Sequence, residues 1–489
     1  MKQKLETLIE AYQGHFVERE DEIKGAFLAI LANENLLFLG PPGTAKTYLA
    51  QNICSSIDDA EFFYYLLTRF TTPEEIFGPL SLKALEEDEF RRKTDGCLPT
   101  SHIGFLDEIF KANSSILNSL LTLLNERKFH NGPNVVSTPL LSIFGASNEL
   151  PEEDENLEAL YDRFLFRYEV KPISFEENLR KLIFESPETF LPPKNLSVDE
   201  IRAIREQAKD VEFYEDAMDI LMAIRRELTK VGDGGTQIYI SDRRWKKIVH
   251  VLKVAAAAQG HTKVNRSMLL LLEHLLWDHP DQKNAIRRIV IELTMSGGQS
   301  YDDLEEKIKG LDPKKYSNKK IHLPVPVTHV SSARNNTTVA TLEEVKEVCR
   351  RGGNGYNDGR PFRMQNKYYS FDELIEALRI EYGIDSKLEM KDSFVGYLAE
   401  VAKLRFEFLA LEKFNTKYFD HFKRDLEKNI WTNSRDVDEV VVYHQKELSR
   451  IQHLDKEISK LERIKKIEDL QKNEDDQRTN QRNYNVFGY

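Results

Sequence analysis

Residues 36–47 read LLFLGPPGTAKT, an apolar run followed by a loop of glycine, proline and small residues and then by a lysine and a threonine. The run Leu36–Leu39 has the length and composition of a buried strand, and the residues after the loop open a predicted helix. A glycine-rich loop between a strand and a helix is typical of phosphate binding, because backbone N–H groups at the helix start point toward the anion. The stretch therefore predicts an α/β fold that binds a phosphorylated ligand.

The residues of this loop are Gly40, Pro41, Pro42, Gly43, Thr44, Ala45, Lys46 and Thr47. We predict that Lys46 neutralises charge on the β- and γ-phosphates of ATP and that Thr47 places its hydroxyl on Mg²⁺. Ala45 departs from the usual pattern, which has a second glycine at this position. A chance loop is the alternative, and the strand before the loop and the helix after it argue against that alternative.

A second motif lies farther along the chain, where the predicted strand His102–Leu106 ends in Asp107 and Glu108. Carboxylates at the carboxyl end of a buried strand lie at the edge of an α/β sheet where ligands bind. We predict that Asp107 holds Mg²⁺ through water and that Glu108 orients or deprotonates the attacking water. Read alone, the pair could be a solvated strand end, but the phosphate-binding loop favours the catalytic interpretation.

Two further positions carry polar groups suited to a nucleotide site. Asn148 follows the predicted strand Leu140–Ala146, and its amide could hold the lytic water, although it could also cap a turn. Arg163 and Arg167 stand just before and on the last predicted strand. Either arginine could reach the γ-phosphate of a neighbouring subunit as an arginine finger, which would require a ring of subunits. The alternatives are local pairing of Arg163 with Asp162 and a structural role for Arg167.

The first third of the chain alternates apolar runs with helical stretches, which predicts a parallel sheet covered on both faces. The five predicted strands are Leu36–Leu39, Phe62–Leu67, His102–Leu106, Leu140–Ala146 and Phe164–Val170. The segment Thr68–Ser101 is predicted to be an insertion, in which Leu80–Ala84 could pair with Phe90–Thr94 across an acidic turn. Asn131-Gly132 predicts a second hairpin.

From Ser174 to about Asp278 the hydrophobic period becomes 3.6, which predicts an all-helical domain with capped helix starts at Ser197 and Ser241 and a stop at Gly260. The stretch SDRRWKK at 241–247 places four cations at a helix start, where they oppose the helix dipole. We predict that Arg243 contacts the phosphate of ATP. Nucleic-acid contact by the patch and a solvated face are the alternatives.

Beyond Asp312 the chain is rich in proline, asparagine and glycine until Phe371, which predicts a small inserted module with some strand. Two long amphipathic stretches follow and predict an antiparallel helical hairpin that turns at residues 429–433. The predicted domains are a nucleotide-binding core at 1–172, a lid at 173–279, a discontinuous helical domain at 280–311 and 371–471, the module at 312–370 and a polar tail at 472–489.

Composition narrows the class of protein. The 489 residues suggest about three structural units, and 69 basic against 81 acidic residues give a net charge of −12, which disfavours general DNA coating. The three cysteines are too few and too scattered for a disulfide framework or a zinc site, and no histidine or cysteine spacing indicates a metal. We recognise neither a signal peptide nor a membrane span. We expect a cytoplasmic protein.

The chain resembles the MoxR family of AAA+ ATPases and, within it, the RavA-type regulatory ATPases. The motifs that carry the resemblance are GPPGTAKT, TRFTTPEEIFGPLS, FLDEIFKA, LLTLLNERKF, ASNELPE, LEALYDRFLFR and SDRRWKK, all within residues 36–250. Alanine before the lysine of the loop is usual in this family. The resemblance implies an AAA+ core, an all-helical lid and a helical C-terminal domain interrupted by a small β-containing module.

By this similarity Lys46 and Thr47 belong to Walker A, Asp107 and Glu108 to Walker B, and Asn148 is sensor 1. Arg163 would be the arginine finger and Arg243 sensor 2. The resemblance implies a Mg²⁺-dependent ATPase that assembles as a hexameric ring. It also implies that the ring remodels or matures protein partners together with a protein that carries a von Willebrand factor A (VWA) domain. The insertion Thr68–Ser101 resembles the helix-2 insert of the AAA+ clade to which this family belongs. The alternatives are a nucleic-acid motor of that clade and a scaffold whose assembly is locked by ATP.

Overall fold

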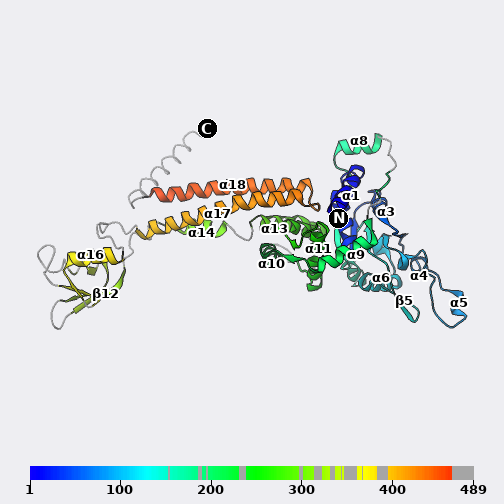
Figure 1. The fold of residues 1–489 in the computed structure, drawn as a ribbon, viewed down its shortest axis with the longest axis horizontal. Coiled ribbons are helices and arrows are strands. Elements are labelled where there is room, and N and C mark those ends of the chain that lie inside the picture. The colour runs from blue at the N-terminus through cyan, green and yellow to red at the C-terminus, as the bar shows by residue number, and fades with distance from the viewer. Residues whose placement is uncertain are drawn as a thin grey trace, which may run out of the picture. The chain divides into compact units, whose positions relative to one another are not determined.

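The computed structural model (Figure 1) divides the chain into two compact units. The first comprises residues 1–299 and 417–445, and the second comprises residues 300–416 and 446–489. The structure describes residues 1–151, 155–184, 190–193, 196–230, 238–296, 301–312, 322–330, 336–342, 344–345, 348, 361–365, 367–382 and 395–464. The predicted tail at 472–489 lies outside these residues.

A five-stranded sheet forms the centre of the first unit, in the order β3-β4-β7-β1-β8. Its strands are β1 (Asn35–Leu39), β3 (Phe62–Leu66), β4 (Ile103–Asp107), β7 (Ser142–Ser147) and β8 (Phe164–Glu169). All neighbouring strands pair in parallel, and β1 and β7 are buried along their whole length. The prediction of five parallel strands is confirmed. The central strands are apolar runs that need cover on both faces, whereas the edge strand β3 is partly exposed.

Helices join these strands and cover the sheet. They are α1 (Lys2–His15), α2 (Glu20–Ala32), α3 (Lys46–Ser55), α6 (Ser114–Glu126) and α7 (Glu155–Tyr161). The start of α6 is fixed by Asn113, whose side chain accepts a hydrogen bond from the backbone N–H of Ile116. The C-terminal end of α6 is held at the start of β1, because the guanidinium of Arg127 donates to Asn33 O and to Asn35 Oδ1.

The insertion between β3 and β4 contains α4 (Pro73–Phe77) and α5 (Leu82–Leu85). The predicted pairing of Leu80–Ala84 with Phe90–Thr94 is wrong over most of its length, because the first segment turns into α5 after a single bridge between Leu80 and Arg92. Ser81 caps that helix by accepting from Ala84 N. The second predicted hairpin is present as β5 (Lys128–Asn131) and β6 (Asn134–Ser137), whose turn contains Gly132 at φ +65°.

In its described residues the lid is helical, apart from short paired segments. β10 (Glu212–Phe213) pairs with β11 (Lys263–Val264) within the lid, and β9 (Leu196–Ser197) pairs with β2 (Ile57–Asp58) of the nucleotide-binding core. Its helices are α8 (Glu176–Phe184), α9 (Val198–Lys209), α10 (Glu215–Thr229), α11 (Asp242–Ala258), α12 (Glu273–Leu276) and α13 (Lys283–Ser296). Ser197 and Ser241 cap α9 and α11 as predicted, and Gly260 follows the end of α11 at φ +78°.

A late segment of the chain completes the core of this unit. The helices α17 (Val395–Lys428) and α18 (Ser434–Arg463) are joined by the predicted turn, which is inserted into the lid. There Trp431 Nε1 donates to Ala255 O at 3.0 Å, and Gln259 Nε2 donates to Asn429 Oδ1 at 3.0 Å. The structure therefore groups residues 417–445 and α13 with the nucleotide-binding part, which differs from the predicted boundary at 280.

In the second unit, three helices share one apolar cluster. α14 (Asp302–Gly310) contributes Leu304 and Ile308, which pack with side chains of α17 and α18. Phe408 and Leu454 are among the buried residues on those two long helices. The amphipathic stripes that predicted the helical hairpin are therefore core stripes here.

The same unit contains a four-stranded antiparallel sheet in the order β13-β12-β14-β15. Its strands are β12 (His322–Val330), β13 (Asn336–Thr341), β14 (Phe362–Met364) and β15 (Lys367–Tyr369). Leu374 and Leu378 of α16 (Phe371–Tyr382) pack in the core of this sheet with Phe362. The sequence predicts that α16 belongs to the flanking helical domain. In the structure α16 is part of the module instead, because its apolar face is buried against the strands.

Candidate functional site

Three neighbouring strands bring the phosphate-binding loop, Asp107, Glu108 and Asn148 to the carboxyl edge of the central sheet. β7 lies between β4 and β1, so the ends of these strands are adjacent. The loop Gly40–Thr47 follows β1, Asp107 ends β4, and Asn148 follows β7. The N–H of Gly40 donates to Ser147 O at 3.0 Å, which ties the loop to the end of β7.

The backbone of the loop has conformations that few residues can adopt. Gly40 has φ +151°, and a Cβ at this position would stand 2.1 Å from Val170 O. Gly43 has φ +79°, and a Cβ built there would meet none of the described atoms within 4 Å, so the loop is open at this point. Ala45 caps α3 in the left-handed region at φ +62°. This explains why the usual pattern has glycine here, since a left-handed alanine costs about 1–2 kcal/mol.

Lys46 folds back over the loop. Its Nζ donates to Gly40 O at 2.7 Å and to Pro41 O at 2.9 Å, and it lies 3.5 Å from Thr44 Oγ1. Burial lowers the pKa of Lys46, while Asp107 and Glu108 act in the opposite direction. A phosphate placed against the loop could exchange these carbonyl contacts for charge-assisted hydrogen bonds.

Asp107, Glu108 and Asn148 lie together beside the lysine. Asp107 Oδ1 accepts from the N–H of Glu108 at 3.0 Å, and burial raises the pKa of the Asp107 carboxyl. Asn148 Nδ2 donates to Glu108 Oε1 at 2.9 Å, and Lys111 Nζ lies 3.2 Å from Glu108 Oε2. Glu108 has φ +53°, a strained conformation of the kind that clusters at active sites.

The residues at this edge fit a nucleotide phosphate with Mg²⁺. Thr47 is the second residue of α3, directly after Lys46, and is half-buried. A threonine hydroxyl and the Asp107 carboxylate are oxygen ligands, which are the donors that Mg²⁺ takes in proteins. The open loop at Gly43 and the start of α3 supply the place where an anion would be stabilised by backbone N–H groups.

Arg163 lies at the edge of the sheet that is formed by the amino ends of the strands, opposite the edge that carries the phosphate-binding loop. It precedes β8, and its carbonyl accepts from Asn35 Nδ2 at 3.1 Å, at the first residue of β1. Its Nη1 donates to the exposed carboxylate of Asp162 at 2.8 Å. β1 has five residues with a rise of about 3.3 Å each, so the loop after β1 begins roughly 16 Å from its first residue.

Arg243 also lies at the edge formed by the amino ends of the strands, as Arg163 does. Its Nη2 donates to Asn125 Oδ1 at 2.7 Å, in the last turn of α6, whose end is held at the start of β1. One turn later on α11, Lys247 Nζ donates to Glu34 Oε2 at 2.6 Å, just before β1. Desolvation, together with the nearby charge of Arg243, lowers the pKa of Arg163. Arg163 and Arg243 therefore lie near each other, and both lie away from the phosphate-binding loop of their own chain.

Arg167 has a different environment. It is 1% exposed and donates to Trp277 O at 2.5 Å and to Asp278. Arg244 Nη1 donates to the same carboxylate at 2.5 Å, and desolvation, with Arg167 nearby, lowers the pKa of Arg244 to about 10. The alternative that Arg167 is structural agrees with these contacts.

The sequence motifs do not identify Arg244 or Asp278 as partners of Arg167. The available signal was the helical period, since Arg244 stands four and seven positions before the buried residues Ile248 and Val251. An arginine on the apolar face of a helix requires a buried partner.

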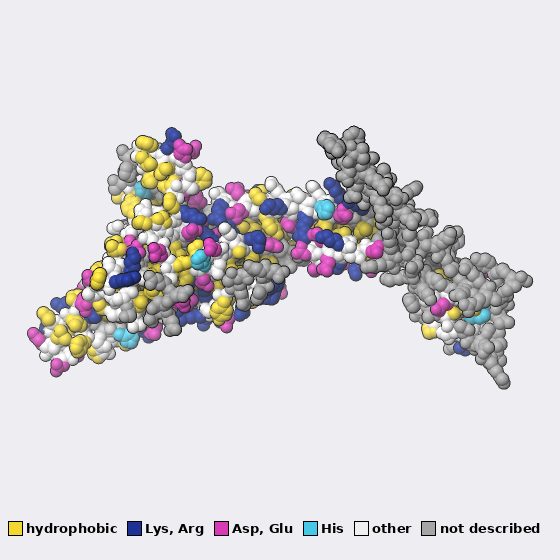
Figure 2. Space-filling view, turned by 180° about the vertical axis from the view of Figure 1, so that it is seen from behind, with side chains coloured by type: hydrophobic (Ala, Val, Ile, Leu, Met, Phe, Trp, Pro, Cys, Tyr) yellow, Lys and Arg dark blue, Asp and Glu magenta, His cyan; other side chains and the backbone are white. Residues whose placement is uncertain are grey.

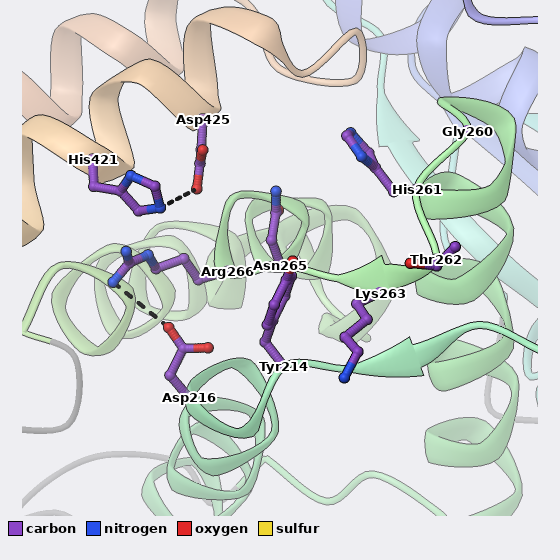
Figure 3. A pocket seen from close by; sticks show the side chains of 10 residues that line it. All are labelled: Tyr214, Asp216, Gly260, His261, Thr262, Lys263, Asn265, Arg266, His421 and Asp425. Atoms are coloured by element: carbon purple, nitrogen blue, oxygen red, sulfur yellow. Dashed lines mark ion pairs between the residues drawn. The ribbon is translucent and has the colours of Figure 1, made fainter.

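A pocket of about 410 Å³ lies elsewhere in the first unit (Figure 3). Lys263 and Arg266 line it together with Asp216 and Asp425, and Figure 3 shows Arg266 paired with Asp216 and His421 paired with Asp425. Arg266 lies 3.7 Å from Asp216, and its guanidinium stacks 3.6 Å above the ring of Tyr418. None of the predicted site residues lines this pocket, and its arginine is held by partners within the protein.

Comparisons with known proteins agree with the sheet and the lid. A family model described as the MoxR domain in the MoxR-vWA-beta-propeller ternary systems matches residues 3–189. A second model, described as an AAA lid domain, matches residues 216–290. The first match contains the loop, Asp107, Glu108, Asn148 and Arg163, and the second contains Arg243.

Two similar proteins are uncharacterized proteins of Methanocaldococcus jannaschii. One is 46% identical over 309 residues, which are 63% of this chain and 79% of the relative, and the other is 47% identical over 279 residues, which are 57% and 72%. A structural protein of Acidianus two-tailed virus is 28% identical over 277 residues, which are 50% of this chain and 45% of that protein. The crystal structure of a candidate ATPase from Cytophaga hutchinsonii covers 60% of this chain and 93% of its own, with 18% identity and a TM-score of 0.48.

Proposed function

The chain belongs to the MoxR family of AAA+ ATPases, and from this premise we propose that it hydrolyses ATP to ADP and phosphate in a ring of identical subunits. One observation carries the proposal. Lys46, Asp107, Glu108 and Asn148 converge at one edge of the sheet, while Arg163 and Arg243 lie together at the other. A complete catalytic site would then combine the edge of one chain that carries Lys46 and Glu108 with the edge of a second chain that carries Arg163 and Arg243.

The residues at the carboxyl edge have separate roles in this proposal. Lys46 binds the β- and γ-phosphates, and Thr47 and Asp107 hold Mg²⁺, which when bound neutralises charge on the phosphate oxygens. Glu108 accepts the proton of the attacking water, and the amide of Asn148 positions that water beside the carboxylate to which it is hydrogen-bonded.

We propose that Arg163 and Arg243 act on the nucleotide of the neighbouring subunit. Arg163 is the finger that stabilises charge in the transition state, and Arg243 is the sensor 2 residue that contacts the same phosphates. Repeating this contact, in which different faces of two copies meet, generates a ring if the rotation closes. We infer a hexamer from the family resemblance.

The target of the ATPase is proposed from the family alone. The matching domain is described as part of MoxR-vWA-beta-propeller ternary systems, which supports a VWA-domain partner. A role in remodelling or maturing proteins in the cytoplasm is proposed from the resemblance to RavA-type regulators. Among the described residues no helix combines the length and apolarity of a membrane span.

Mixing inactive variants tests the division between subunits. Arg163→Ala should be inactive because it lacks the finger, and Glu108→Gln because it lacks the base. In a mixed ring some sites combine an intact base with an intact finger, so phosphate release should exceed the sum of the separate rates. Arg243→Ala mixed with Glu108→Gln should recover activity in the same way.

Lys46→Ala mixed with Glu108→Gln is the matched control. Both changes damage the same edge, so no arrangement of subunits restores a complete site. If mixed assembly is demonstrated and the Arg163→Ala mixture gains no more than this control, catalysis between subunits is refuted. If Glu108→Gln turns over ATP normally, the assignment of the base is refuted.

A further inference from the structure

The helix α8 exposes an apolar stripe. Phe175, Leu179, Leu182 and Ile183 follow the spacing i, i+4, i+7 and i+8 and are 65%, 41%, 64% and 61% exposed. This spacing puts them on one face of the helix. α8 buries none of its described side chains. Hydrophobic side chains gather on the projection of the first unit that carries α8 (Figure 2). An apolar face of this kind commonly marks an interaction surface.

The orientation of α8 is fixed by Glu18. The carboxylate of Glu18 accepts four hydrogen bonds at the start of the helix, from Ser174 N, Ser174 Oγ, Phe175 N and Asn178 Nδ2. Desolvation opposes ionisation, but these hydrogen bonds prevail and lower the pKa of Glu18 to about 2. These hydrogen bonds therefore fix the orientation of α8 and of its apolar stripe.

α8 stands at the phosphate-loop edge of the sheet. It begins shortly after β8 ends, where Val170 N donates to Leu39 O at 2.6 Å and a Cβ on Gly40 would meet Val170 O. Arg19 Nη2 donates to Lys171 O at 2.8 Å, which fixes the chain between β8 and α8. A neighbour that brings its arginines to the loop must approach this edge.

A second exposed apolar surface lies near Arg243. Met218 and Met222 are 47% and 44% exposed and share one face of α10, and Tyr239 is 73% exposed two residues before the cap of α11. One turn after Met222, Arg225 Nη2 donates to Asp242 Oδ1 at 3.0 Å. This face of α10 therefore points to the start of α11, where Arg243 lies.

We propose that the stripe of α8 in one copy of this chain packs on Met218, Met222 and Tyr239 of the next copy. The inference rests on the proposed function, because the arginines act in trans only if the Arg243 edge of one subunit meets the loop edge of its neighbour. The two apolar surfaces stand on those two edges. Methionine side chains adapt to the shape of an apolar helix, as in other helix-binding grooves.

An assembly measurement tests the stripe. In the Glu108→Gln background with ATP, sedimentation velocity would give the concentration at which rings form. Leu182→Asp should raise that concentration at least about tenfold, because it places a charge in an apolar contact. Lys181→Asp is the matched control on the opposite face of α8 and should leave assembly unchanged. Unfolding is excluded by an unchanged Tm and an unchanged affinity for ATP.

Crosslinking identifies the occupant. Leu179→Cys and Met222→Cys would be made in separate chains that lack the natural cysteines Cys54, Cys97 and Cys349, and the two proteins would be mixed with a short bismaleimide. An ATP-dependent crosslink between the two variants supports the proposal. Crosslinks within either single-variant sample, or none in a mixture that forms rings, overturn it.

The two failures are distinguishable. If rings form in ATP and the arginine mixtures recover activity, but Leu182→Asp assembles like Lys181→Asp, the docking of α8 is refuted and the proposed function stands. If the Glu108→Gln protein forms no ring at all in ATP, both the proposed function and this interface are refuted.

Discussion

Asn148 Nδ2 donates a hydrogen bond of 2.9 Å to Oε1 of Glu108, so the two polar side chains at the ends of adjacent strands are directly joined. The other oxygen of Glu108 lies 3.2 Å from Lys111 Nζ. Both oxygens of the proposed base are therefore oriented by side chains of the same chain. The amide acts on the position of the carboxylate as well as on the water that the carboxylate would deprotonate.

We expect Asn148→Ala to lower kcat about 10- to 100-fold, which is no more than the lower end of a full general-base contribution, because Asn148 only positions the base and the water. The affinity for ATP should change little, because Asn148 contacts Glu108 and not the phosphate-binding loop. Phosphate release and binding of a fluorescent ATP analogue measure the two effects separately. Glu149→Ala, at the next exposed position, is the control and should retain kcat. A similar loss in both variants would contradict the role of the amide.

Ala45→Gly should stabilise the protein by about 1 kcal/mol, because glycine adopts the left-handed conformation at φ +62° without the penalty of a Cβ. Thermal unfolding without nucleotide would show this as a higher Tm. Ala50→Gly is the control in the same helix and should lower the Tm, since glycine is unfavourable inside a helix and Ala50 is buried. Equal shifts in the two variants would argue against strain at Ala45.

Asp278→Ala should destabilise the first unit by about 3–5 kcal/mol, because it leaves the buried guanidinium groups of Arg167 and Arg244 without their shared carboxylate. The measurement is a denaturant titration followed by tryptophan fluorescence, in which Trp277 is a neighbouring reporter. Asp281→Ala, three residues away with a 90% exposed side chain, should cost less than about 1 kcal/mol. Comparable losses would show that the carboxylate is not the essential partner.

The raised pKa of the buried residue Glu22 predicts that the stability of the protein depends on pH. Desolvation, together with Asp21, raises the pKa of Glu22 from 4.5 to about 7. The folded state therefore binds the proton of Glu22 more tightly than the unfolded state does. Protonation of Glu22 stabilises the folded protein fully below pH 4.5, and this stabilisation is lost as the pH rises through about 7. Glu22→Gln, which cannot ionise, should therefore gain about 1–3 kcal/mol over the natural protein at pH 8, relative to the difference at pH 4.5.

Thermal unfolding at the two pH values measures that difference. Glu20→Gln changes an exposed glutamate on the same helix and should shift the Tm equally at both. A pH-independent effect of Glu22→Gln would mean that the buried carboxyl ionises normally in the folded protein.

The sheet and its loop edge were predictable because their signals are local. The apolar runs fix the strands, and Lys46, Asp107 and Asn148 must meet once those strands are parallel and adjacent. The edge on which Arg243 lies was not predictable, since it depends on how the lid packs against α2 and α6. The predicted pairing of Leu80–Ala84 with Phe90–Thr94 across an acidic turn also failed, because Ser81 caps the helix Leu82–Leu85 within the first segment.

The boundaries of the units depend on contacts between distant parts of the sequence, which periodicity does not record. The turn at residues 429–433 was predicted as a connection between two helices, and nothing in its five residues indicated that it would be inserted into another domain. Likewise, the apolar face of α16 could have packed on either the strands or the helices around it.

That turn also sets an order of events during synthesis. Asn429 Nδ2 donates to Ser267 Oγ at 3.1 Å across 162 positions of the chain, and Trp431 donates to Ala255. At translation rates of about 5–20 residues per second, the ribosome needs on the order of ten seconds to pass from one partner to the other. During that interval the emerging lid lacks its final piece, and the apolar surface that Trp431 covers is open to water. An apolar surface left open in this way favours aggregation of the nascent chain until residues 429–433 have left the ribosome.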